Sequence, residues 1–211
     1  HQVRRLLPKQ PILNLLKFFM IIFLLKILEP IKKHHGIKIC HIIVFPGSRS
    51  VPTVEDDAVY FLGSFGEVFR INRKTGKADW KIKLSDRYPD ATTPKWGYAQ
   101  CTLIVGDILI VMPFGENTGI AGWDKKTGAE LWKSGGIGNT HSSPTVANFG
   151  GTEQIILLTT GDAGGLNSFD PKSGKNLWSS QLYKNRIPIT IPIQLSEDRL
   201  FVSGGYDGGS K

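Results

Sequence analysis

Residues 72–80 read NRKTGKADW, residues 124–132 read DKKTGAELW and residues 170–178 read DPKSGKNLW. Each copy begins with Asp or Asn, carries Thr or Ser directly before a glycine, and ends in a tryptophan four residues after that glycine. The tryptophans at 80, 132 and 178 are 52 and 46 residues apart. This spacing is typical of one four-stranded blade of a β-propeller, so the repeat predicts one blade per copy.

The residue types of the repeat have a physical reason. An Asp or Asn side chain can bond backbone groups two residues further on, and glycine adopts the positive φ that closes a short hairpin loop with a bulge. Before each turn, apolar residues flank Arg70, Gly122 or Ser168, which predicts half-buried strands. We expect the repeated residues to be structural, with each tryptophan packing one blade against the next. They are Gly76, Trp80, Gly128, Trp132, Gly174 and Trp178.

Two further strands are expected upstream of each turn unit, because short β-branched and aromatic runs precede it. The blades are predicted at about 50–84, 100–134 and 142–182, with a partial fourth at 190–211. Propellers close with about four to eight blades, since closure removes exposed sheet edges. We therefore expect an all-β fold, a partial β-propeller of four-stranded antiparallel blades at 46–211, as a fragment of a longer propeller.

Residues 1–45 form a head of different composition. The first 46 residues hold eight Lys or Arg and one acidic residue, Glu29, so they carry +7 of the net charge of +8. The basic balance therefore does not indicate nucleic-acid binding by the repeats. An apolar run at 11–28, interrupted by Lys17 and Lys26, is open to three interpretations: a stretch not native to this domain, a signal or membrane anchor, or an amphipathic helix.

The chain has two cysteines, Cys40 in the head and Cys101 in the second blade. Spacing alone does not determine whether they pair. The sequence shows no CxxC motif, no His/Cys ligand cluster and no calcium loop, so no metal site is predicted.

At the repeats the chain resembles the family of PQQ-binding-like β-propeller repeat proteins. The order of strand, glycine turn, strand, Lys-Thr-Gly-Lys-like turn and tryptophan is followed at 59–80, 108–132 and 154–178. The resemblance covers about 46–211, and the stretches 47–54 and 96–99 resemble a bacterial branch described as BamB-like. The head is not covered.

The resemblance implies two classes of function. One is a non-catalytic scaffold in the periplasm or cell envelope that binds other proteins, without a cofactor, with membrane association through the head as an option. The other is a quinoprotein alcohol dehydrogenase, which would use PQQ with calcium and a vicinal Cys-Cys pair. No adjacent cysteines occur here, so the scaffold is the preferred interpretation and no catalytic residue is assigned.

Candidate contact residues follow from the expected strands and loops. Four polar residues occupy the same offset at the start of the first strand of each blade and could form a channel rim: Ser50, Gln100, Ser142 and Thr190. The loops 90–98, 135–142 and 183–188 are the expected partner contacts, with Trp96, Tyr98 and His141 as candidates. His141 lies beside two serines, but without a nucleophile elbow it is interpreted as a loop histidine.

Overall fold

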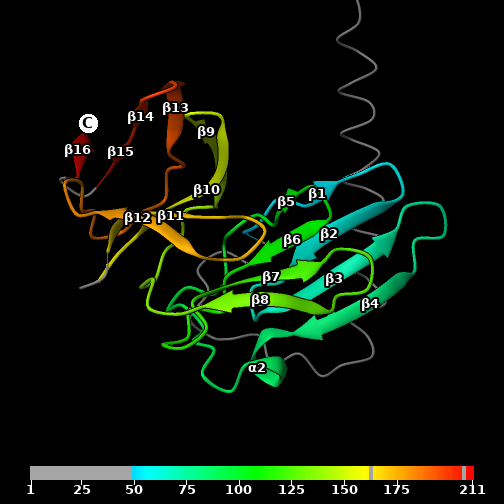
Figure 1. Cartoon of the computed structure of the whole chain (residues 1–211). Coiled ribbons are helices and arrows are strands. Elements are labelled where there is room, and N and C mark those ends of the chain that lie inside the picture. The colour runs from blue at the N-terminus through cyan, green and yellow to red at the C-terminus, as the bar shows by residue number, and fades with distance from the viewer. Residues whose placement is uncertain (1–48, 162–163, 206–207) are drawn as a thin grey trace, which may run out of the picture. The chain divides into compact units, whose positions relative to one another are not determined.

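The computed structural model describes residues 49–161, 164–205 and 208–211; the predicted head with Cys40 lies outside them. Three four-stranded antiparallel sheets follow one another in chain order, each with its strands in sequence order (Figure 1). The first contains β1 (Thr53–Val54), β2 (Ala58–Leu62), β3 (Glu67–Asn72) and β4 (Ala78–Lys83). The second contains β5 (Leu103–Val105), β6 (Ile108–Val111), β7 (Ile120–Asp124) and β8 (Glu130–Ser134). The third contains β9 (Thr145–Phe149), β10 (Thr152–Thr159), β11 (Gly165–Phe169) and β12 (Asn176–Ser180).

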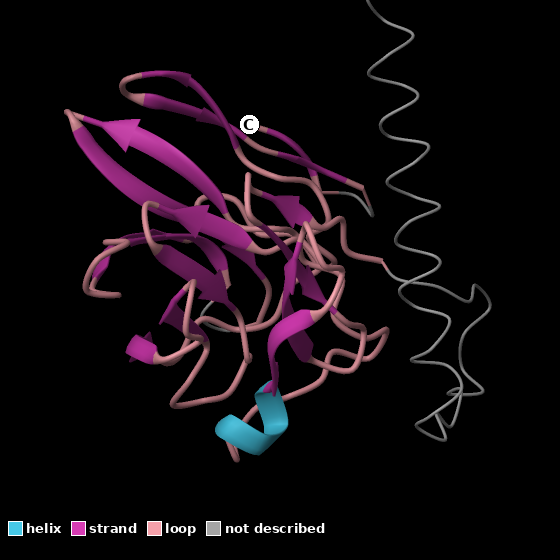
Figure 2. Cartoon of the chain, turned by 90° about the vertical axis from the view of Figure 1, so that its right-hand side faces the viewer, coloured by secondary structure: helices cyan, strands magenta, loops and turns pink. Residues whose placement is uncertain are grey.

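The chain then forms two strand pairs. They join β13 (Ile193–Ser196) to β14 (Arg199–Phe201), and β15 (Ser203–Gly204) to β16 (Gly209–Ser210). A short helix that the sequence did not predict, α2 (Leu84–Arg87), follows β4 (Figure 2). The predicted all-β partial propeller of four-stranded blades is thus confirmed.

Each repeated phrase forms the turn between the third and fourth strands of a blade. In the second blade, Asp124 Oδ1 accepts hydrogen bonds from the backbone N–H of Lys126 (3.1 Å) and Thr127 (2.7 Å), and the Gly128 N–H donates to the Asp124 carbonyl at 2.8 Å. Gly128 has a φ of 73°, in the left-handed region that glycine adopts without strain. Asn72 and Asp170 make the same contacts in the other two blades.

The expected bulge is present beside every one of these turns. The pairing register shifts between Arg70 and Ile71, between Gly122 and Trp123, and between Ser168 and Phe169. The expectation that Arg70, Gly122 and Ser168 face outward from half-buried strands is wrong, however, because all three are buried. Arg70 is paired with Tyr60 on one side and Trp80 on the other, so its side chain lies on the face of the sheet that carries these aromatics.

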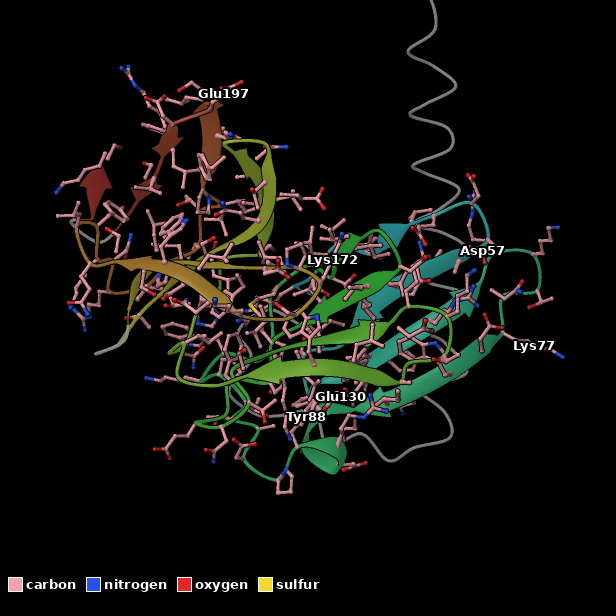
Figure 3. All side chains as sticks on the ribbon, viewed as in Figure 1. Asp57, Lys77, Tyr88, Glu130, Lys172 and Glu197 are labelled. Carbon is pink, nitrogen blue, oxygen red and sulfur yellow. The ribbon has the colours of Figure 1, made fainter. Side chains whose placement is uncertain are left out.

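Burial of Arg70 requires partners for its charge. Its guanidinium donates to Asp57 at 2.6 Å, to Asp79 and, through Nε, to the Tyr60 hydroxyl at 3.2 Å. Asp57 lies at the end of the first sheet beside β2 (Figure 3). Burial raises the pKa of Tyr60, so its hydroxyl remains a neutral partner of Arg70.

The repeated tryptophan of one blade packs against the turn of the next blade. The Trp80 indole Nε1–H donates to the Lys126 carbonyl at 3.0 Å, and that of Trp132 donates to the Pro171 carbonyl at 3.0 Å. The turn glycine provides the space, because a Cβ on Gly174 would overlap the Trp132 ring. A Cβ on Gly128 would lie 2.7 Å from Ile82 and 3.3 Å from Trp80. The glycine therefore serves both the turn and the contact between blades.

Trp178 is a different case. Its indole donates to Gln154 within its own blade at 2.9 Å, and its ring lies 6.4 Å from that of Phe149. The third copy of the phrase thus keeps its turn, but its tryptophan contacts only residues of its own blade in these two interactions.

In the part of the chain that the structure describes, no helix is long and apolar enough to cross a membrane.

Substituting Gly174 tests the contact between blades. Gly174→Ala adds a methyl group at a φ of 68° and against Trp132, whereas Gly151→Ala adds one at a φ of 76° with no atom within 4 Å. Both variants incur about 1–2 kcal/mol of backbone strain. Overpacking should cost G174A about 1–3 kcal/mol more in urea unfolding of the full chain. Equal destabilisation of the two variants would contradict the role of this contact.

The Asx turns predict a specific acid sensitivity. The hydroxyl and backbone N–H of Thr127 lower the pKa of Asp124, and the backbone N–H and hydroxyl of Ser173 lower that of Asp170. Because these folded-state pKa values are depressed, their stabilisation is present above the unfolded value of about 3.9 and is lost as the pH falls through the folded values.

Urea unfolding at pH 5 and pH 3 should therefore show a smaller loss of stability for the D124N/D170N double variant than for the unchanged chain. Asn keeps the acceptor oxygen, as Asn72 does in the first blade, but does not titrate. An identical loss in both proteins would show that the two carboxylates contribute nothing to acid stability.

Candidate functional site

The three loops that the sequence selected contribute to one cavity of about 520 Å³. Trp96 comes from the first loop, His141 from the second and Ile187 from the third. The remaining lining residues are Arg49, Ala99, Cys101, Ser143, Ile189 and Ile191. The cavity therefore lies where the segments leading into the first strands of successive blades meet.

A tight turn holds Trp96 at the cavity. The Gly97 N–H donates to the Pro94 carbonyl at 2.8 Å, and Gly97 has a φ of 78°. A Cβ at this position would lie 2.8 Å from the Ser64 carbonyl oxygen. The Trp96 side chain is 41% exposed, and its ring centroid lies 5.3 Å from that of His141. Lys95 Nζ lies 5.7 Å from the same indole ring. An exposed aromatic is thus presented on a hydrogen-bonded turn.

The prediction of Tyr98 as a partner contact is wrong, because its side chain is 2% exposed. Its ring stacks on Phe114 at 5.8 Å, and its hydroxyl lies 3.3 Å from the carbonyls of Thr92 and Pro113. Burial raises its pKa to about 12. Tyr98 therefore stabilises the loop from the buried side, while Trp96 is exposed.

His141 is fixed through its backbone. Its N–H donates to the Pro188 carbonyl at 3.0 Å, which joins the second and third loops. Burial lowers the pKa of His141, and the positive charge of Arg49 lowers it further. The imidazole is consequently neutral at pH 7.

The four residues predicted as a channel rim make hydrogen bonds within the chain. The Ser142 hydroxyl donates to the Thr190 carbonyl at 2.7 Å, and the Gln100 amide donates to the Thr140 carbonyl, so both connect successive blades. The Ser50 hydroxyl donates to the Leu62 carbonyl at 2.5 Å, and that of Thr190 donates to the Ser203 carbonyl. Ser50, Gln100 and Ser142 are buried and Thr190 is exposed. Ligand binding by this rim stays a prediction.

Cys101 was not assigned to the site from the sequence. Its thiol accepts a hydrogen bond from the Val51 N–H at 3.4 Å, and its own N–H donates to the Ser143 hydroxyl at 2.9 Å. Arg49 and the isoleucines were also missed, although the alternation of Ile187, Ile189, Ile191 and Ile193 is visible in the sequence. Among residues 49–161, 164–205 and 208–211, no group of three or more His, Cys, Asp or Glu could hold a metal ion.

The position of Arg49 beside His141 can be tested by NMR titration. The pKa of His141 should lie below the ordinary value of about 6.5 and should rise in the Arg49→Gln variant, because a neighbouring cation disfavours the imidazolium. The His141→Asn variant assigns the resonance among the five histidines of the chain. An unchanged pKa in R49Q would place Arg49 away from the imidazole.

Comparison with solved structures finds matches at low sequence identity. BamB from Moraxella catarrhalis is 14% identical with a TM-score of 0.48, and the match covers 78% of this chain and 58% of that one. The computationally designed Ika4 protein is 15% identical with a TM-score of 0.48, covering 79% of this chain and 92% of that one. Quinohemoprotein alcohol dehydrogenase from Comamonas testosteroni is 20% identical with a TM-score of 0.48, covering 63% and 20%. The chain thus spans less than two thirds of the length of the Moraxella protein.

No curated protein matches the sequence. The family model described as outer membrane protein assembly factor BamB matches residues 33–207, which is most of the chain. Together with the repeated turns and the blades that they form, this match shows that the chain belongs to this family of PQQ-like β-propeller repeat proteins.

Proposed function

We propose that this propeller is a non-catalytic scaffold of the cell envelope, and that it binds another protein at the cavity lined by Trp96, His141 and Arg49. The observation that carries the proposal is the exposed Trp96 on its hydrogen-bonded turn. Tryptophan and arginine are the residues that most often dominate the energy of protein interfaces. The extracytoplasmic location is proposed from membership of the family.

The construction of the cavity supports a binding role. Backbone and side-chain hydrogen bonds from Gln100, His141 and Ser142 hold the loops of neighbouring blades together, so the surface is organised before a partner arrives. Such preorganisation reduces the conformational entropy lost on binding. The proposal assigns no quinone and no calcium ion to these residues.

The proposed function can be tested by photo-crosslinking in the envelope of the source cells. A benzoylphenylalanine at position 96 of the full chain should crosslink to a discrete protein, because it stands in the proposed contact surface. The same group at Lys77, an exposed position on the β3–β4 turn, should not (Figure 3).

Two results would contradict the scaffold. One is the same crosslinking pattern at positions 96 and 77. The other is turnover: if the purified full-length protein reduces a dye in the presence of an alcohol after addition of PQQ and calcium, it is a quinoprotein dehydrogenase.

A further inference from the structure

The cavity at Trp96 has an apolar wall with a regular spacing. Ile187, Ile189 and Ile191, at every second position of a segment without regular secondary structure, all line it. Ile189 is 55% and Ile191 45% exposed, so this wall is open to an incoming side chain. The indole of Trp96 adds an aromatic surface. An aliphatic side chain therefore has apolar neighbours from two separate segments.

The charge of the cavity is positive. Arg49 lines it, and Lys95 lies beside the Trp96 ring. Asp and Glu are absent from its lining. In the described part of the chain, Arg49 makes no ion pair, whereas the buried Arg70 is bonded to two carboxylates. Burial, and after it the positive charge of Arg49, lowers the pKa of His141.

These two properties select one kind of occupant. A guanidinium forms its strongest contact with a carboxylate, through paired N–H donors. The volume of about 520 Å³ lies within the range of roughly 300–1,000 Å³ found for binding pockets. The three isoleucines give this cavity an apolar wall that suits an aliphatic side chain.

We propose that the cavity binds a segment of the partner protein in which acidic and aliphatic residues are neighbours. The aliphatic side chain packs between Ile189, Ile191 and Trp96, and the adjacent carboxylate pairs with Arg49. This inference rests on the proposed scaffold function and specifies the chemistry of its partner. It also assigns Arg49, which the sequence did not indicate, as a specificity residue.

The direct test is binding of defined peptides to the full chain by fluorescence anisotropy. The probe is fluorescein-labelled Gly-Leu-Glu-Leu-Glu-Gly with an amidated C-terminus, so that its carboxylates are those of the glutamates. Two matched peptides replace either both glutamates by lysine or both leucines by serine. The parent probe should bind at least about tenfold more tightly than either, and the affinity should fall with added salt.

Variants of the protein locate the binding. Arg49→Glu and Trp96→Ala should each weaken binding of the parent probe about tenfold or more, since charged and aromatic anchors dominate such contacts. Lys172→Glu makes the same charge change on the exposed β11–β12 turn (Figure 3) and should leave the affinity within about twofold. Circular dichroism spectra that match the unchanged chain show that each variant is folded.

Each outcome decides the proposal. Equal binding of the lysine peptide or of the serine peptide would overturn it, and so would an R49E variant that binds like K172E. If the probe fails to bind while crosslinking at position 96 still captures a discrete protein, the scaffold function stands and the acidic segment is wrong. If both fail, the scaffold itself is wrong.

Discussion

The contact between a tryptophan of one blade and the turn glycine of the next is the interaction on which the rest of this structure depends. The Trp132 indole occupies the place where any other residue at Gly174 would put a Cβ, and at Gly128 Ile82 and Trp80 leave little room for one. The Nε1–H groups of Trp80 and Trp132 satisfy carbonyls of the neighbouring turn at 3.0 Å. Steric fit and hydrogen bonding thus both position one blade against the next. The repeated phrase supplies the tryptophan on one side of this contact and the glycine turn on the other.

Stacking of the blades also sets the geometry of the candidate site. Because successive blades are held in place, the segments that lead into their first strands converge, and hydrogen bonds such as Ser142 to the Thr190 carbonyl connect them. Trp96 and His141, 45 positions apart in the sequence, are brought to a ring distance of 5.3 Å in this way. The cavity is therefore a product of the repeat, while its chemistry comes from loop residues that the repeat leaves free to vary.

The sequence predicts the fold well because glycine turns and Asx caps act locally. The bulges, the positive φ of Gly76, Gly128 and Gly174, and the strand order all follow from residues within one hairpin. It predicts burial and the site less well, since these depend on contacts between blades. Arg70 looks like an exposed strand residue but is buried beside Tyr60, and Tyr98 looks like a loop contact but stacks on Phe114. No sequence pattern around Arg49 indicated that it belongs to the site.

The most direct measurement of the central contact is hydrogen exchange of the indole N–H groups by NMR in the native state. If the blades are coupled as described, the Trp80 and Trp132 indoles exchange only through unfolding, with a free energy equal to that of urea unfolding. The exposed Trp96 indole should exchange quickly in the same sample. Exchange of Trp80 and Trp132 as fast as that of Trp96 would show that the blades are not held together by these tryptophans.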